Sequence, residues 1–219
     1  MRKYIRYILY LVVFTGFSIV NAGSYDDFFV AVRQDNALVV RELLGRGFDP
    51  NTPNPQGLHG LLLALKYPSL KVAEVLVNDP KTSVETLNAA GESPLMLAAL
   101  KGLTDLCKQM IDRDADVNKP GWTPLHYAAT GGNVSTMQLL LDNHAYIDAA
   151  SPNGSTPLMM AAMYGTDTAV KLLLDGGADP TLKNDLGLTA IDFATQASKP
   201  VSVNVIAAAM RARKYLGTW

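Results

Sequence analysis

The chain has 219 residues, of which 48% are hydrophobic, and its 19 basic and 20 acidic residues give a formal net charge of −1. This balance argues against nucleic acid or an anionic membrane as the partner, because both require a basic protein surface. Cys107 is the only cysteine, so an intramolecular disulfide is excluded.

The segment 1–22 has the pattern of a secretory signal peptide. Basic residues near the start are followed by an apolar stretch at 7–20, and Val20 and Ala22 stand at the −3 and −1 positions of a cleavage site. We predict cleavage after Ala22 and a periplasmic or secreted mature chain. An uncleaved anchor is the alternative, although the apolar stretch is shorter than a membrane span, which needs about 20 residues.

Two helical units come next along the chain. Residues 25–56 keep helical periodicity and end in the turn sequence Gly47-Phe48-Asp49-Pro50-Asn51. Residues 57–90 form a second unit with its first helix at Gly60–Leu65. The sequence Asn78-Asp79-Pro80 is predicted to break the second helix of that unit.

Four closely similar segments follow, at 91–120, 121–153, 154–186 and 187–219. Gly121, Gly154 and Gly187 are evenly spaced with a period of 33, and the first two precede Trp-Thr-Pro-Leu-His-Tyr-Ala-Ala and Ser-Thr-Pro-Leu-Met-Met-Ala-Ala. A fixed period of this length indicates stacked helical repeats. Such stacks present an extended surface and rarely enclose a deep catalytic cleft.

These segments resemble the ankyrin repeat, whose signature is Thr-Pro-Leu-His-x-Ala-Ala followed by a second helix and a Gly-Ala-Asp turn. The resemblance covers almost everything after residue 24. It implies an all-α solenoid of about six helix–turn–helix units joined by hairpin-like loops, with 25–56 and 187–219 as capping repeats. Together with the leader, the pattern is similar to that of exported, periplasmic bacterial members of the family.

The residue choices also have physical reasons of their own. Thr123 can cap the first helix of its repeat, and the proline that follows suits a helical position that needs no N–H. Paired alanines such as Ala128-Ala129 let neighbouring helices approach closely. Gly132 and Gly165 are expected between the two helices of a pair, in the left-handed conformation.

One repeat is short, because the spacing from Gly91 to Gly121 is 30 where the later repeats have 33. Three residues are therefore missing near Lys119-Pro120. Length changes in repeats fall in the loops of one face, often the binding face. The short loop is interpreted either as drift or as a feature that shapes a site.

Nothing in the sequence indicates catalysis, a metal or a cofactor. The histidine of the repeat signature, His126, is expected to brace its turn, whereas His59 and His144 are expected to be solvated loop residues. Cys107 is predicted to be a small buried hydrophobe. One aspartate per repeat is predicted to stabilise the hairpin at the same position, namely Asp116, Asp148 and Asp179. A capping helix over 201–215 carries Arg211, Arg213 and Lys214 near its end, where they would complement the helix dipole.

The resemblance also indicates which positions would contact a partner. Ankyrin partners usually lie along the hairpin tips and the exposed side of the first helices. The residues after the opening glycines are Leu58, Glu92, Trp122, Ser155 and Leu188, and those late in the first helices include Lys66, Tyr67, Leu100, Lys101, Thr130, Met163, Tyr164 and Gln196. Trp122, Tyr164, Met163, Leu100 and Tyr67 have the composition of an interface hot spot. Alternatively, Trp122 only covers the neighbouring hairpin.

We therefore expect a non-catalytic module that holds or protects a protein partner. No nucleic acid, cofactor or stable membrane insertion is expected. Two alternatives stay open. One is an accessory protein that binds a small ligand or haem or supports oxidative-stress defence, which the methionine-rich fifth repeat would suit. The other is a secreted effector that binds host proteins.

Overall fold

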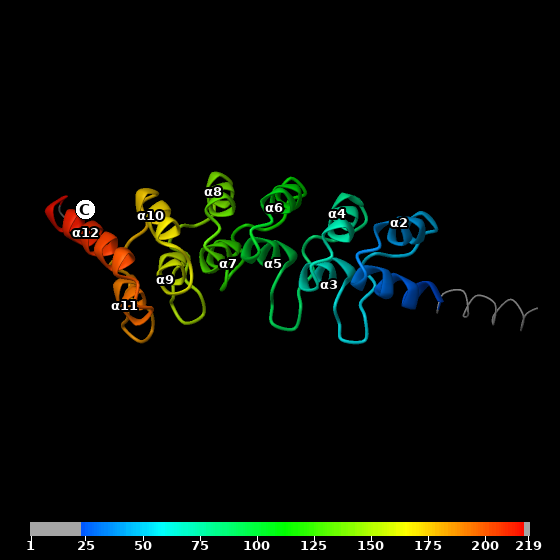
Figure 1. Ribbon diagram of the computed structural model, residues 1–219, viewed down its shortest axis with the longest axis horizontal. Coiled ribbons are helices and arrows are strands. Elements are labelled where there is room, and N and C mark those ends of the chain that lie inside the picture. Colours follow the sequence, from blue (N-terminus) through cyan, green and yellow to red (C-terminus); the bar gives the residue numbers. More distant parts are fainter. Residues whose placement is uncertain (1–22, 217–219) are drawn as a thin grey trace, which may run out of the picture. The chain divides into compact units, whose positions relative to one another are not determined.

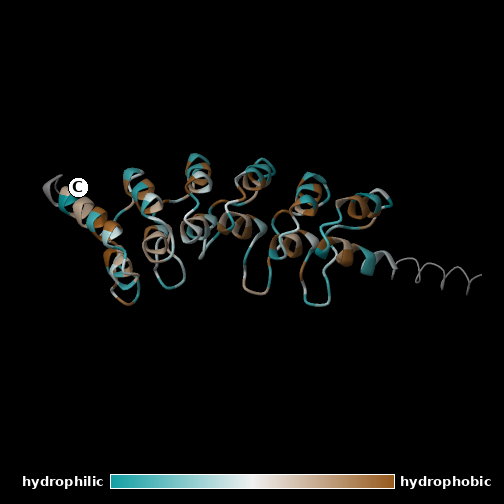
Figure 2. Cartoon of the chain, viewed as in Figure 1, coloured by the Kyte–Doolittle hydropathy of each residue, from teal (hydrophilic) through white to brown (hydrophobic). Residues whose placement is uncertain are grey.

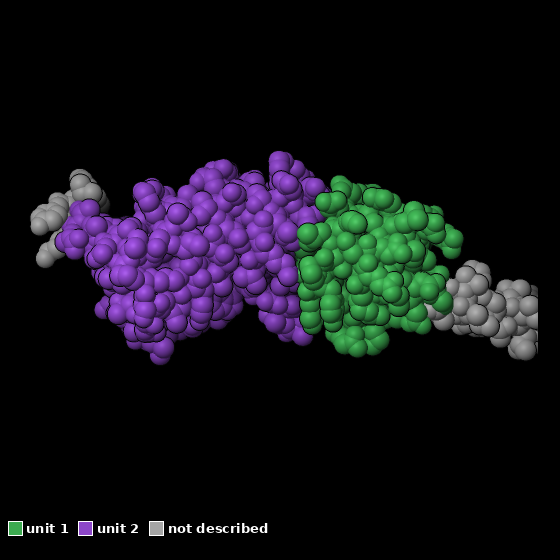
Figure 3. Space-filling view, viewed as in Figure 1, with its two compact units in different colours: residues 1–83 green, residues 84–219 purple. Residues whose placement is uncertain are grey.

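The computed structural model describes residues 23–216, except for the side chains of 214–216, and divides into two compact units at Ser83 and Val84 (Figure 3). The described residues form helices and loops, with no strands among them. The predicted signal peptide lies outside the described residues. None of the helices in 23–216 is long and apolar enough to cross a membrane.

The first unit contains a helix at 23–33 followed by α2 (Ala37–Gly45), α3 (Gly60–Lys66) and α4 (Leu70–Asn78). Helix α4 packs against both α2 and α3. The fully buried ring of Phe28 stacks on Phe48 with 4.5 Å between ring centroids. The predicted break after α4 is confirmed, since this helix ends at Asn78.

The second unit consists of four helix pairs (Figure 1). The first helices of the pairs pack on one another in one layer, and the second helices form the other layer. The first-helix layer contains α5 (Pro94–Leu100), α7 (Pro124–Gly131), α9 (Pro157–Met163) and α11 (Ala190–Gln196). The second-helix layer contains α6 (Thr104–Ile111), α8 (Val134–Asp142), α10 (Asp167–Asp175) and α12 (Pro200–Leu216). With the two pairs of the first unit, the six predicted helix pairs are present.

The predicted helix caps are confirmed in the second unit. The side chains of Ser93, Thr123 and Thr156 each accept a hydrogen bond from the backbone N–H three residues later, and a proline begins each helix. The side chain of the third helical residue accepts a hydrogen bond from the N–H of the capping residue. The acceptor is the sulfur in Met96 and Met159. In the first unit, His59 precedes α3 without a side-chain cap, which makes this repeat the degenerate one.

Side chains in the loops tie consecutive repeats together. Asp116 and Asp179 each accept the N–H two residues further on, as predicted for turn residues. Asp148 does not share their position, so that expectation is wrong. It accepts the N–H of Asp179 at 3.0 Å and therefore links two repeats. Tyr146 takes the place of Asp116 in this repeat, because each of them directly follows the buried alanine of its turn.

The core lies between the two helix layers, and the helices carry most of the hydrophobic residues (Figure 2). Both members of each alanine pair at 98–99, 128–129 and 161–162 are fully buried, which confirms the predicted close approach of the first helices. Cys107 is fully buried as predicted, and burial raises the pKa of its thiol to about 12.

The two glycines expected to be left-handed differ. Gly132 has a φ of 67°, which confirms the prediction. Gly165 does not have a positive φ, so the prediction is wrong there. Its lack of a Cβ matters for packing instead, because a Cβ at this position would lie 2.3 Å from the carbonyl oxygen of Ala129.

The final helix, α12, spans nearly the predicted range. Arg213 forms an ion pair with Asp179, with 3.0 Å between Nη1 and Oδ1. This basic residue therefore links α12 to the loop after α10, a contact that the dipole argument did not predict. Arg211 is exposed, and the side chain of Lys214 lies outside the described part.

Candidate functional site

An apolar pocket of about 210 Å³ opens on the first-helix layer of the second unit. Its lining comes from three consecutive repeats. Leu100 ends α5, Tyr127 and Thr130 lie on α7, and Met160 lies on α9, while Trp122 stands in the loop before α7. We call these five residues the Trp122 pocket.

Trp122 is held by its own repeat. Its ring makes a T-shaped contact with the ring of His126, with 5.2 Å between ring centroids and 77° between ring planes. The loop that carries it is visibly shorter than the loops before α5, α9 and α11 (Figure 1). The missing residues near Lys119 therefore fall next to the pocket, and the half-buried indole forms one of its walls.

Tyr127 connects the pocket to an acidic group. Its hydroxyl donates to Oε1 of Glu92 at 2.8 Å, and the Nδ2 of Asn88 donates to Oε2 at 2.6 Å. Burial, with the hydrogen bond and charge of Glu92, holds the pKa of Tyr127 well above its usual range. The phenol therefore stays protonated and keeps donating to the carboxylate.

The structure brings some of the predicted contact residues together and separates others. Leu100, Trp122 and Thr130 line the pocket. Tyr164 is 61% exposed at the end of α9, Met163 and Leu188 are half-buried, and Lys101 and Gln196 are exposed; none of these lines the pocket. The first unit carries exposed Lys66 and Tyr67 and half-buried Leu58.

The position of Ser155 contradicts the prediction made for it. It was expected on the surface because it follows Gly154 as Trp122 follows Gly121, but it is fully buried. Its carbonyl oxygen lies 2.9 Å from Nε2 of His126, and its N–H donates to Ser151. Ser155 is therefore part of the packing between repeats and cannot contact a partner in this structure.

Sequence reasoning missed Tyr127 and Met160. Both occupy the variable position of the repeat signature, just before the paired alanines, and they stand one full repeat apart. Because the same position in consecutive repeats faces the same side of the first-helix layer, this spacing could have placed them together. The prediction considered only positions earlier and later in each repeat.

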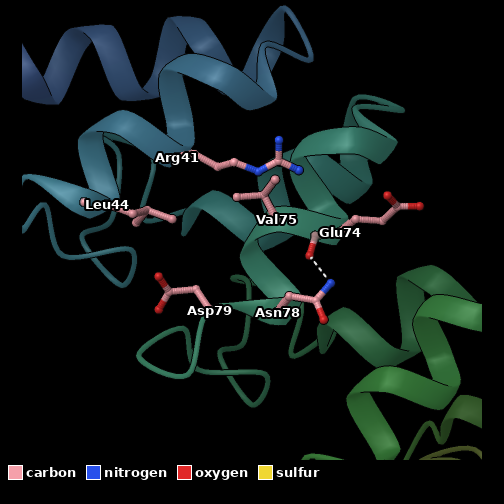
Figure 4. A pocket seen from close by; sticks show the side chains of 7 residues that line it. Arg41, Leu44, Glu74, Val75, Asn78 and Asp79 are labelled. Atoms are coloured by element: carbon pink, nitrogen blue, oxygen red, sulfur yellow. Dashed lines mark hydrogen bonds between the residues drawn. The ribbon is translucent and has the colours of Figure 1, made fainter.

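Two larger grooves lie on the second-helix side. One, of about 380 Å³, lies between α2 and α4 in the first unit (Figure 4). The other, of about 480 Å³, lies between α8 and α10 in the second unit. Their linings occupy matching repeat positions, with Leu44 corresponding to Leu141 and Val75 to Leu172. We therefore attribute these grooves to the helix spacing of the repeats, while the Trp122 pocket depends on particular side chains.

The titratable residues within 23–216 can be compared with the arrangement that a metal site needs. Within residues 23–216, no group of three or more histidine, cysteine, aspartate or glutamate side chains is placed to hold a metal. His126 is fully buried and braces its turn as predicted, because Nδ1 lies 2.9 Å from the hydroxyl of Thr123. Burial lowers its pKa to about 4, against weaker opposing hydrogen bonds to the carbonyl groups of Ser155 and Ala149.

Comparison with known proteins agrees with this architecture. The family model described as ankyrin repeats, in three copies, matches residues 28–120, 61–151, 95–184 and 132–209 in overlapping registers. The chain belongs to the ankyrin repeat family.

Two solved structures share the ankyrin fold over most of this chain. An ankyrin repeat domain from Acinetobacter baumannii AYE has a TM-score of 0.71 and 22% identity, and the match covers 84% of this chain and 97% of that one. The second match is to a chain in the structure of a predatory endopeptidase from Bdellovibrio bacteriovorus in complex with an immunity protein. It has a TM-score of 0.71 and 27% identity, covering 83% of this chain and 97% of that one.

The similar curated proteins are much longer than this chain. A Danio rerio protein named as a palmitoyltransferase is 30% identical over 131 residues, which are 57% of this chain and 20% of the relative. Ankyrin repeat and SAM domain-containing protein 6 of Rattus norvegicus is 31% identical over 109 residues, or 48% of this chain and 12% of the relative. The match thus spans a fifth or less of the length of these relatives.

Proposed function

We propose that this ankyrin protein is a non-catalytic interaction module that binds a partner protein through the first-helix layer of its second unit. The Trp122 pocket is the observation that carries the proposal. Interface hot spots are enriched in aromatic residues that lie in desolvated pockets with little charge at the centre. The exposed ring of Tyr164 would add contact area beside the pocket.

The family supports this class of function. Ankyrin repeats generally bind other proteins. One matched structure contains an endopeptidase in complex with an immunity protein. That likeness favours an enzyme as the class of partner, which the ankyrin protein would hold or protect.

We also propose that the mature protein acts after export. The support is the basic and apolar pattern of residues 1–22 with Ala22 at the −1 position. Intact mass spectrometry of the protein from its native cell should show a chain that begins at Gly23. A mass that includes residues 1–22 would refute cleavage and favour the anchor.

An affinity pull-down tests the binding function. The bait is mature Gly23–Trp219 and the source is the periplasmic fraction, with bound proteins identified by mass spectrometry. We expect one protein to be enriched by the wild type and reduced at least about tenfold by Trp122→Ala with Tyr164→Ala, because removing a hot-spot side chain costs about 2 kcal/mol or more.

The control variant is Tyr146→Ala, which removes a ring that is 67% exposed but does not line the pocket. It should retain the partner. Capture that is unchanged by all three substitutions would refute the proposed binding face. Absence of any enriched protein would instead favour a small ligand or a partner outside the producing cell.

A further inference from the structure

We propose that the Trp122 pocket receives one large apolar side chain from a protein partner, and that an adjacent basic residue of that partner pairs with Glu92. This inference rests on the proposed function and specifies the chemistry of the partner. It goes beyond the general protein-binding role of ankyrin repeats because it assigns an anchor and a charge to particular residues.

The size of the pocket sets the size of its occupant. Its volume of about 210 Å³ lies below the roughly 300–1,000 Å³ that is usual for pockets holding drug-sized molecules or cofactors. A space of this size suits a single leucine, phenylalanine or tryptophan side chain. A haem group or another cofactor would not fit in it.

The lining sets the polarity of the occupant. Leu100, Met160 and the rings of Trp122 and Tyr127 present carbon and sulfur to the pocket. Both hydroxyl groups in the lining already donate within the protein. Thr130 donates to the carbonyl oxygen of His126 at 2.8 Å, and Tyr127 donates to Glu92. A polar group would therefore lose its hydration without gaining these donors, which favours an apolar side chain.

Glu92 supplies the charge. It is half-buried, and within the described residues its two carboxylate oxygens accept hydrogen bonds from two neutral donors, Tyr127 and Asn88. None of the ion pairs in 23–216 includes it. An uncompensated carboxylate beside an apolar pocket is complementary to a cation, so a lysine or arginine next to the apolar anchor fits best.

The charges at the two ends of α5 indicate on which side of the pocket the basic residue of the partner lies. Glu92 precedes the helix, whereas Leu100 and Lys101 are at its C-terminal end, and the helix between them is about 10 Å long at 1.5 Å per residue. The basic residue of the partner should therefore lie on the loop side of the pocket. On the opposite side it would meet Lys101, where like charges repel.

Blocked dipeptides can test both parts of the inference by NMR on the mature chain. The probes are acetyl-phenylalanyl-arginine amide, the same peptide with glutamine in place of arginine, and acetyl-alanyl-arginine amide. We expect the first probe to shift the indole N–H signal of Trp122 and the methyl signal of Met160 saturably at millimolar concentration. The glutamine probe should bind at least about threefold more weakly, and the alanine probe should not saturate.

Substitutions in and near the Trp122 pocket test whether the probes bind there and pair with Glu92. Glu92→Gln should equalise the arginine and glutamine probes, whereas Asp105→Asn removes an equal charge from α6 and should preserve the preference. Thr130→Phe fills the pocket and should abolish binding of all probes. If circular dichroism shows that Thr130→Phe melts at a lower temperature than the wild type, Leu100→Trp is the substitute, because it fills the pocket from a different helix.

Two results would overturn the inference. One is equal binding of the arginine and glutamine probes to the wild type, and the other is the lack of any saturable shift at Trp122 and Met160. If the pull-down still depended on Trp122 and Tyr164, the proposed function would stand and only the chemistry assigned to the partner would fail. If no partner depended on these residues, the proposed function would fail as well.

Discussion

His126 connects the chemistry of one side chain to the stacking of repeats. Its Nδ1 accepts from the backbone N–H of Thr123 at 3.2 Å, so Nε2 carries the proton and donates to the carbonyl oxygen of Ser155 at 2.9 Å. One neutral imidazole thus closes its own turn and holds the next repeat. Protonation would put a proton on Nδ1 and break the first bond while placing a charge in the core.

The stability of the protein should therefore depend on pH through His126. Its pKa is lowered from 6.5 to about 4 in the folded state, so the unfolded chain takes up a proton first as the pH falls. The contribution is complete above about pH 6.5 and is lost toward pH 4, by up to about 3 kcal/mol. Urea unfolding between pH 7 and 5 should show about 2 kcal/mol of this loss.

The variants that check this prediction have matched counterparts in the chain. His126→Met copies the residue at the same position in two neighbouring repeats, Met96 and Met159. This variant should have a lower free energy of unfolding at pH 7, because the bond to Ser155 is lost. Between pH 6.5 and 5 its free energy of unfolding should depend less on pH than that of the wild type. His144→Gln removes an exposed histidine and should leave the slope unchanged. An equal slope in His126→Met would refute the assignment.

At the scale of single elements, the second helices end in two different ways. In four repeats a residue two or three places after the helix end, directly before the turn, is left-handed. It is glycine at Gly47 and Gly177, with φ of 91° and 95°, but Asp114 and His144 adopt φ of 62° and 66° in the same place. A side chain other than glycine costs about 1–2 kcal/mol in this conformation. Two helices therefore carry a conformational cost that the others avoid.

Replacing His144 by glycine should raise the free energy of unfolding by about 1 kcal/mol, because it removes the strain of the Cβ while the chain still accepts the bond from Asn118 through a backbone carbonyl. Thermal unfolding followed by circular dichroism measures the gain. Asn143→Gly is the control. Its φ is −101°, so glycine there should bring no gain. Equal effects of the two changes would contradict the explanation.

At the scale of the whole molecule, each repeat contacts only its neighbours, so stability depends on interfaces between repeats. Leu140 and Leu43 occupy the same helical position in α8 and α2 and are 0% and 4% exposed. Their own burial is therefore nearly equal. They differ in the number of neighbouring second helices, since α8 packs against both α6 and α10, whereas α2 packs against α4.

Leu140→Ala should therefore cost more than Leu43→Ala. A buried leucine truncated to alanine typically costs about 2–5 kcal/mol, and we expect Leu140 at about 4 and Leu43 at about 2. Chemical unfolding of both variants, read by circular dichroism, gives the two values. Equal losses would show that the array does not unfold by coupling between neighbours.

Most of the architecture was predictable because it follows from local spacing. The repeat period, the capping threonines and the paired alanines are patterns of nearby residues, and they indicated the six helix pairs and the buried Cys107. The prediction failed at Gly165 and Asp148, where the same residue type serves a different contact. Gly165 allows close packing without a left-handed turn, and Asp148 joins two repeats, so neighbouring repeats determined both.

The sequence by itself determined the order of the helix pairs, the helix caps and the core positions, because these depend on residues a few places apart. Only the tertiary structure decided which surface residues form a pocket. Trp122 and Ser155 both follow an opening glycine, yet Ser155 is buried, with its carbonyl oxygen held by His126. Exposure depends on what the next repeat places against a side chain. The Trp122 pocket therefore arises from three repeats, and no single repeat encodes it.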